Sequence, residues 1–409
     1  MSTTAPLRLG AQSKLAVPLA AAIGGNMSVR TIFALPLLAA CGPKEPSPTG
    51  AAVASPDTLP RVITVEEEAL GGVVKVDVRC PNASLEPVCK DGAAAAIREI
   101  QRIGDIADTW NNTDGDVARI NAAAGGEPVA AGEDVLRMVT AGQTVAAASQ
   151  GAFDITVGAL SGLWDVPGAD LPDRETIQER LQYVDWTRVR VAGGEVSLEG
   201  EGMGIVLGAV VKGDAADRAL AHIPQDYDVK IDVGTDYIVR GEWEVEVPLP
   251  GAMPRIATFK VRDTALVTSG TWVASSTPGE GFYKQVVDAR TGAKADGAAV
   301  SVVAHPRGII ADALSTTLRV TGAETSAVEV LGGWGVSFND AGEAVEVGRR
   351  GAIVLDWSVA ELPPPPAAPA EPAPAESAPA EPAPAEPAPA EPASAEPAPA
   401  DPTPPATEK

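Results

Sequence analysis

The chain has 409 residues, of which 45% are hydrophobic, so it is long enough to bury a sizeable core. Its formal net charge of −24 argues against a nucleic-acid-binding protein, because an acidic surface repels phosphate groups. The two histidines are too few for a histidine-rich metal site.

The N-terminal segment has the pattern of an export signal. Met27 begins MSVRTIFALPLLAAC, in which one arginine and a short apolar run precede small residues and Cys41. This ending resembles a bacterial lipobox, and the apolar run is too short to span a bilayer. We therefore predict a leader and lipoprotein signal peptide over 1–41 and a flexible tether over 42–60. The mature protein would be exported and anchored to the lipid bilayer through Cys41, facing the periplasm or the cell exterior.

The C-terminal segment is low in complexity. From Pro363 onward PAEPA repeats with a period of five and contains no large apolar residue. Such a composition cannot bury enough surface to offset its ordering entropy, so a disordered Pro/Ala/Glu-rich tail is predicted over 359–409. The remaining residues, 61–358, are predicted to form the folded domain.

Two cysteines lie within the predicted domain. Once Cys41 is assigned to lipid, Cys80 and Cys89 remain as a pair in RCPNASLEPVCK. Outside the cytoplasm a disulfide across this short loop is the favoured interpretation, and two free thiols are the alternative.

The residue patterns predict an α+β fold with helices packed on largely antiparallel sheets. Alternating strands are expected on both sides of a glycine pair at 71–72. Helices are expected over 91–110, where isoleucines recur at helical spacing, and over 133–148. Beyond Arg188 short strand-like runs are separated by glycine or proline.

The stretch GIIADALSTTL, residues 308–318, is a candidate metal site. Asp312 and Thr316 are four residues apart, so a helix would present both side chains on one face. A carboxylate and a hydroxyl are hard oxygen ligands that suit Mg²⁺, which fills the rest of its shell with water and phosphate oxygens. In the alternative interpretation, Asp312 caps the helix and Thr316 bonds back to the main chain.

Four other segments concentrate glycine, aspartate, serine and threonine: GAFDITVGALSGLW (151–164), LGAVVKGDAADRAL (207–220), VTSGTW (267–272) and VVDARTG (286–292). The second is a glycine turn that leads into a helix, where main-chain amides and Lys212 can meet phosphate. A plain strand-to-helix connection with Lys212 in solvent is the alternative.

These segments, together with WNNTDGDVARIN (110–121) and ADALSTTL (311–318), occur in an order that resembles the ApbE-like flavin transferases, also called FAD:protein FMN transferases. The resemblance covers about 63–333. It implies an Mg²⁺-dependent enzyme that cleaves the pyrophosphate of FAD, its substrate. The FMN phosphoryl group would pass to a Thr or Ser hydroxyl of an exported acceptor protein.

The resemblance also implies roles for individual residues. The metal ligands would be the Asp312 and Thr316 side chains and the main-chain carbonyl of Ala209. The residues that match motifs bordering the flavin substrate are Phe153, Asp154, Thr156, Lys212, Thr268, Ser269 and Gly270. The residues that match the family's DPRTG, with Ala289 in place of proline, are implied to be catalytic: Asp288, Arg290 and Thr291.

The chain departs from the family pattern at several positions. Val206 replaces an aspartate, and Gln285 stands where the family has a histidine suspected of acid/base duty. Glutamine cannot take a proton near neutral pH. The family's NIGGD reads DVGTD, which alters the positions of Asp232 and Thr235. Two alternatives therefore stay open: a non-catalytic FAD-binding lipoprotein, and an FAD pyrophosphatase that releases FMN and AMP. Asp232 or His305 is a candidate replacement for the missing base.

Overall fold

A computed structural model describes residues 59–109, 112–161, 163, 173–249, 255–270 and 286–361, all within one compact unit. The predicted signal peptide, nearly all of the tether, Gln285 and most of the tail lie outside these ranges. Among the described residues, no helix is both long enough and apolar enough to cross a membrane.

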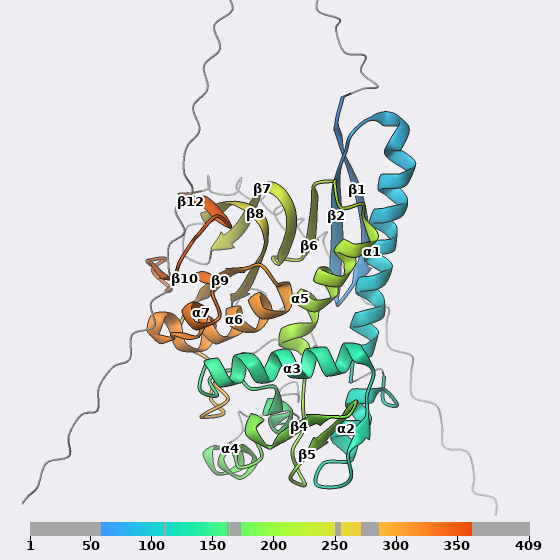
Figure 1. Cartoon of the computed structure of the whole chain (residues 1–409). Coiled ribbons are helices and arrows are strands. Elements are labelled where there is room, and N and C mark those ends of the chain that lie inside the picture. The colour runs from blue at the N-terminus through green and yellow to red at the C-terminus, as the bar shows by residue number, and fades with distance from the viewer. Residues whose placement is uncertain are drawn as a thin grey trace, which may run out of the picture. The chain divides into compact units, whose positions relative to one another are not determined.

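A nine-stranded antiparallel sheet forms the centre of the fold (Figure 1). Its strand order is β1-β2-β6-β7-β8-β9-β10-β11, and β12 pairs with the first half of β8. The strands are β1 Arg61–Ala69, β2 Gly72–Cys80, β6 Val229–Val233, β7 Tyr237–Leu249, β8 Arg255–Gly270, β9 Val300–His305, β10 Trp334–Phe338, β11 Ala344–Gly348 and β12 Val354–Glu361.

Helices cover one face of this sheet, with α1 lying along β1 and β2 (Figure 1). The helices are α1 Glu86–Ala107, α2 Asp116–Ala122, α3 Glu133–Ala148, α4 Arg174–Leu181, α5 Gly208–Ala219, α6 Gly308–Thr321 and α7 Ala327–Val330. A small second sheet, in the order β3-β5-β4, lies beyond α3. Its strands are β3 Val129–Ala130, β4 Val189–Ala192 and β5 Glu195–Leu198.

The large sheet separates two apolar cores. On the helical face, Val74, Val76 and Val78 of β2 pack with the buried isoleucines of α1. The opposite face curls around a second core of aromatic and aliphatic side chains, centred on Phe259, Trp334 and Phe338. Because side chains alternate along a strand, the central strands β7, β8 and β9 contribute to both cores.

The structure confirms the α+β class and most of the predicted elements. Helix α3 has the predicted bounds, whereas α1 begins at Glu86, five residues before the expected start. Pro87 lies in the first turn of α1, where a helix tolerates proline because that amide has no partner. At the other end, β12 continues to Glu361, so residues 359–361 belong to the sheet and not to the predicted tail.

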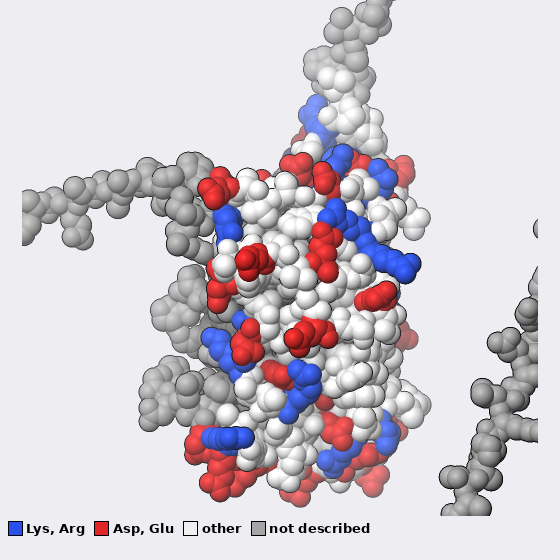
Figure 2. Space-filling model, turned by 90° about the vertical axis from the view of Figure 1, so that its left-hand side faces the viewer, with Lys and Arg blue, Asp and Glu red and all other residues white. Residues whose placement is uncertain are grey.

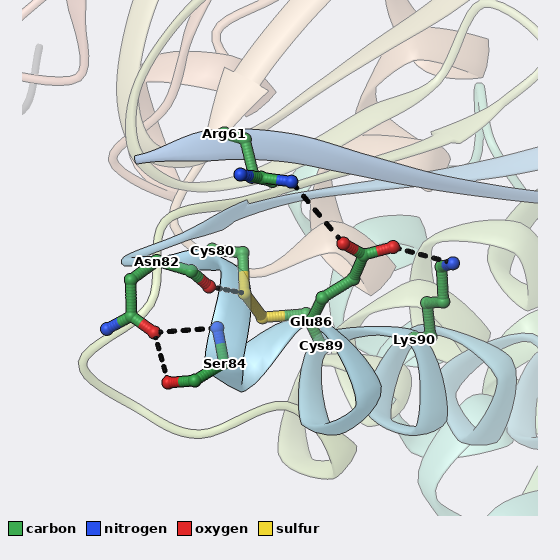
Figure 3. The surroundings of a disulfide bond; sticks show 7 residues. All are labelled: Arg61, Cys80, Asn82, Ser84, Glu86, Cys89 and Lys90. Atoms are coloured by element: carbon green, nitrogen blue, oxygen red, sulfur yellow. Dashed lines mark hydrogen bonds and ion pairs between the residues drawn. A yellow bond between two sulfur atoms is a disulfide. The ribbon is translucent and has the colours of Figure 1, made fainter. Parts of the chain in front are cut away.

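A disulfide joins Cys80, the last residue of β2, to Cys89 in the first turns of α1, as predicted (Figure 3). Both cysteines are fully buried. An ion pair adds a second link, since Glu86 of α1 lies 3.5 Å from the Arg61 guanidinium of β1 and 2.8 Å from the Lys90 ammonium. The helix on which the helical core is built is thus attached covalently to the sheet.

Removal of this disulfide should destabilise the chain. For the double variant Cys80→Ala/Cys89→Ala, we expect the free energy of unfolding to fall by about 2–3 kcal/mol, because the unfolded chain regains the entropy of an open loop. Urea denaturation measures the change, with dithiothreitol-treated wild type as a second comparison. Identical unfolding midpoints for the variant and the oxidised wild type would contradict this expectation.

Candidate functional site

Helices α5 and α6 cross in backbone contact at two glycines. A Cβ atom at Gly213 would lie 2.1 Å from the carbonyl oxygen of Gly308, and a Cβ at Gly308 would lie 2.6 Å from that of Gly213. Asp217 of α5 fixes the start of α6 by accepting hydrogen bonds from the amides of Gly308 (2.7 Å) and Ile309 (3.1 Å). The glycine turn and the ADxxxT segment, far apart in sequence, are thereby brought together.

A buried charge cluster lies at this crossing. The Lys212 ammonium pairs with Asp236, a fully buried residue at the β6–β7 turn. Asp236 Oδ1 also accepts the Thr268 amide of β8 at 2.9 Å. Asp312 of α6 is the second carboxylate near Lys212. Burial raises the pKa of Asp312 to about 7 against the opposing effect of Lys212. Burial also lowers the pKa of Lys212, but the two carboxylates more than offset it and the net shift is upward.

The structure places Asp312 and Thr316 differently from the alternative interpretation, in which Asp312 would cap the helix that carries it and Thr316 would bond back to the main chain. Helix α6 begins at Gly308, so Asp312 does not cap it, and Asp312 Oδ2 instead accepts the Gly213 amide of α5 at 3.0 Å. Thr316 is partly exposed and makes no hydrogen bond to another described residue, whereas its neighbour Thr317 bonds back to the Ala313 carbonyl. The Asp312 carboxylate and the Thr316 hydroxyl therefore both remain suited to binding a ligand.

Ala209 lies one turn before Gly213 and interrupts α5. Its dihedral angles, φ −96° and ψ 17°, depart from helical values. A regular helix would pair the Gly213 amide with the carbonyl of residue 209, but here that amide donates to Asp312. The three predicted metal ligands therefore lie on one distorted helix crossing.

Hydroxyl groups continue the site along β8 and β9. Ser269 Oγ lies 2.8 Å from Ser315 Oγ of α6, and Ser301 of β9 donates to the Ser315 carbonyl at 2.7 Å. Gly270 ends β8 and pairs with Val300. The TSG segment thus lies beside the helix that carries Asp312 and Thr316.

The polar side chains of the FDxT segment, residues 153–156, form hydrogen bonds to other residues of the protein. Asp154 accepts hydrogen bonds from the Thr156 amide (2.8 Å), the Thr156 hydroxyl (2.7 Å) and the Trp186 amide (2.9 Å). Thr156 Oγ1 accepts the Asp185 amide, and Phe153 is buried. Ile155 accepts the Val206 amide at 2.9 Å, which anchors the segment leading into α5. The polar side-chain atoms of Asp154 and Thr156 are therefore used in hydrogen bonds within the protein. They stabilise the FDxT segment and are not free to bind a ligand.

The DARTG segment forms a tight turn beside the FDxT segment. Arg290 donates to both carboxylate oxygens of Asp288, at 2.9 and 2.8 Å, and Thr291 is exposed. Ala295 of this turn packs with Ala152 and with Val320 of α6. No hydrogen bond or ion pair among the described residues joins Asp288, Arg290 or Thr291 to the Lys212 cluster.

Two residues of the site, Asp236 and Ser315, were missed by sequence reasoning. Asp236 is the last residue of DVGTD, and an aspartate that follows a strand and a glycine turn was a usable signal. Ser315 is an unspecified position of ADxxxT and gave none. His305 is a poor candidate base, because its Nδ1 accepts the Arg307 amide at 3.0 Å and its Nε2 then donates to the Leu331 carbonyl at 3.1 Å. Burial also lowers its pKa.

The charged side chains on the face shown in Figure 2 are of both signs and intermixed. No continuous basic patch is visible on this face.

Comparisons with known proteins identify the same family. A model of the ApbE family matches residues 70–331. The FAD:protein FMN transferase of Treponema pallidum is 31% identical over 246 residues, which cover 53% of this chain and 67% of the relative. The enzyme of the same name from Klebsiella pneumoniae is 28% identical over 208 residues, covering 49% and 66% of the two chains.

Solved structures show the same fold. An ApbE protein of Thermotoga maritima superposes with a TM-score of 0.60 at 24% identity, over 70% of this chain and 96% of that protein. The flavin transferase ApbE from Vibrio cholerae also gives 0.60, at 19% identity, over 71% and 98% of the chains. The family model spans more than half of this sequence, and the chain belongs to the ApbE family.

Proposed function

We propose that the chain is an Mg²⁺-dependent FAD:protein FMN transferase, which attaches FMN through a phosphoester to a Thr or Ser of an exported protein. The observation that carries the proposal is the cluster at the α5–α6 crossing, where one lysine faces two buried carboxylates. Beside it lies the Thr316 hydroxyl, which has no hydrogen-bond partner among the described residues. The names of the Treponema and Klebsiella relatives support the same reaction.

The residues at the crossing fit a magnesium ion. Asp312, Thr316 and the Ala209 carbonyl are hard oxygen donors, and Mg²⁺ needs few of these from protein when phosphate and water complete its shell. The described residues contain no group of three or more His, Cys, Asp or Glu side chains that could hold a metal. When bound, the ion would neutralise phosphate oxygens and orient the leaving group.

The chain's own residues would position the pyrophosphate of FAD. Lys212 supplies a fixed positive charge, held by Asp236, toward the phosphate oxygens. In the reaction the acceptor oxygen bonds to the FMN phosphorus, the bond from that phosphorus to the bridging oxygen of AMP breaks, and the hydroxyl proton passes to solvent water. AMP leaves with the electron pair.

We also propose that this reaction takes place outside the cytoplasm, on a lipoprotein held at the membrane through Cys41. The disulfide between Cys80 and Cys89 supports an oxidising compartment. The lipobox-like sequence before Cys41 supports the anchor. Radiolabelled palmitate incorporation in wild type, with its loss in Cys41→Ala, would test this part directly.

The test of the reaction uses the full chain with FAD, Mg²⁺ and an acceptor protein that the Treponema relative flavinylates. A fluorescent flavin band on the denatured acceptor is the expected result. Free FMN and AMP without a labelled acceptor would indicate pyrophosphatase activity, and bound but unchanged FAD would indicate a non-catalytic flavoprotein. Either outcome, with the relative active in parallel, would reject the transferase.

The Gln285→His variant tests the effect of the missing family histidine. If the lost base limits the rate, we expect transfer to rise by about 10²-fold, the usual contribution of one general base. The increase should follow the ionisation of a histidine, so it should be largest above about pH 6.5. Single-turnover rates across pH measure it. An unchanged rate would show that proton removal does not limit the wild type.

A further inference from the structure

Three serines form a row across the large sheet beneath helix α6. Ser301 of β9 is paired in register with Ser269 of β8 on one side and with Ser337 of β10 on the other. Paired side chains share a face of the sheet, so all three serines lie on the helical face. Two residues along the strands, the neighbouring row on this face contains Val267 and Val303 of the helical core. Hydrogen bonding therefore replaces apolar packing at the serine row.

Ser301 ties this row to α6 through its hydroxyl group. The side chain is fully buried, and its Oγ lies 2.7 Å from the Ser315 carbonyl of α6 and 3.2 Å from the Ser269 carbonyl of β8. A serine hydroxyl has one proton, so the shorter contact is the principal bond and the longer contact shares the same proton. A helical carbonyl has a second lone pair, which can accept such a bond from outside the helix. One hydroxyl thus joins β9 to both α6 and β8.

The Ser315 hydroxyl closes a ring of hydrogen bonds. It donates to the Asp312 carbonyl in the preceding turn at 2.8 Å. Its single proton is thereby used, so in the 2.8 Å contact between the two side chains Ser269 Oγ donates to Ser315 Oγ. Ser269 and Ser315 are linked twice, once directly and once through Ser301. None of these bonds involves the Asp312 carboxylate or the Thr316 hydroxyl, the two side-chain groups assigned to the metal ion.

Two attachments of different kinds hold α6 in place. At its start, Gly308 is in backbone contact with α5. About two helical turns later, Ser301 donates its hydrogen bond to Ser315. Asp312 lies between these attachments, and Thr316 directly follows the second. Apolar packing is non-directional and lets a helix rotate slightly about its axis, whereas a hydrogen bond to one carbonyl restricts that rotation.

We propose that Ser301 is a positioning residue, which fixes the rotation of α6 and so keeps the Asp312 carboxylate and the Thr316 hydroxyl aligned for one Mg²⁺ ion. The inference rests on the proposed Mg²⁺-dependent function. Ser301 would contact neither the ion nor FAD, because its hydroxyl is buried beneath the helix and already bonded. Mg²⁺ demands near-ideal octahedral geometry, so a small misalignment of its protein ligands weakens its binding.

The test measures Mg²⁺ binding to the full chain by calorimetry, with FAD present and well below the melting temperature. Ser301→Ala should raise the Kd for Mg²⁺ about five- to tenfold, which corresponds to the contribution of one hydrogen bond. The transfer rate should recover at saturating Mg²⁺, because the ligands themselves remain. Ser337→Ala is the matched control from the same row, since the Ser337 hydroxyl bonds to the Val345 carbonyl of β11 at 3.4 Å and not to α6. It should leave the Kd for Mg²⁺ unchanged.

Ser301→Cys separates the hydrogen bond from the packing. A thiol is a weak donor that still fills the buried position, so this variant should fold and yet bind Mg²⁺ more weakly than wild type. A wild-type Kd for Mg²⁺ in both Ser301 variants would overturn the proposal, as would an equal increase in Ser337→Ala. Mg²⁺ binding without transfer in wild type would reject only the transferase, whereas a wild type that binds no Mg²⁺ would reject both.

Discussion

Replacing Asp312 with asparagine is expected to lower Mg²⁺-dependent FMN transfer by about 10³-fold and to leave the chain folded. A bound cation contributes several kcal/mol to transition-state stabilisation, and an amide is a much poorer ligand for Mg²⁺ than a carboxylate. The asparagine oxygen can still accept the Gly213 amide, which now lies 3.0 Å from Asp312 Oδ2. Initial rates of AMP release at saturating FAD measure the loss, and circular dichroism checks the fold.

Two adjacent threonines of α6 provide the matched control. Thr316→Val removes the partly exposed hydroxyl that bonds to no other described residue, so it should reduce Mg²⁺-dependent turnover with little change in stability. Thr317→Val removes a buried hydroxyl that bonds to the Ala313 carbonyl at 2.9 Å, so it should reduce stability by about 1 kcal/mol and spare turnover. Normal activity in Asp312→Asn, or equal losses in the two threonine variants, would place the metal elsewhere.

Gly213→Ala should cost about 3 kcal/mol or more of unfolding free energy. The new Cβ would lie 2.1 Å from the Gly308 carbonyl oxygen and 2.8 Å from the Ile309 amide nitrogen, and neither backbone atom can move without shifting α6. Because α6 carries Asp312, transfer should fall together with stability.

Gly208→Ala is the control in the same helix. A Cβ atom at Gly208 would have no neighbouring atom within 4 Å, so the substitution should change stability by less than about 1 kcal/mol, with helix propensity favouring alanine. Urea denaturation of both variants gives the comparison. Similar unfolding free energies for Gly213→Ala and Gly208→Ala would show that the two helices do not meet as closely as described.

Periodic segments were predictable from the sequence, and their ends were less so. Helix α3 has the predicted bounds because its apolar residues repeat without interruption and a glycine precedes its first residue. The start of α1 was missed because proline usually interrupts a helix, although Pro87 is well accommodated in a first turn. The end of the sheet was placed three residues early because Val359 and Ala360 merge in composition with the tail.

The site was predictable as a set of motifs but not as a set of contacts. The sequence identifies Lys212 and Asp312, but not that a glycine crossing brings them together or that Asp236 holds the lysine. Tertiary hydrogen bonds also divide the motif residues in a way that spacing does not reveal. Asp154 and Asp288 use their carboxylates inside the protein, whereas Thr316 keeps its hydroxyl free of other described residues.

The most direct measurement is the stoichiometry of the reaction. Wild type, FAD and acceptor are incubated with Mg²⁺ or with EDTA, AMP is quantified by chromatography, and the acceptor is weighed by mass spectrometry. The account predicts one AMP released for each acceptor that gains the mass of FMN less one water, with both products absent in EDTA. AMP released without acceptor labelling, or equal labelling in EDTA, would contradict it.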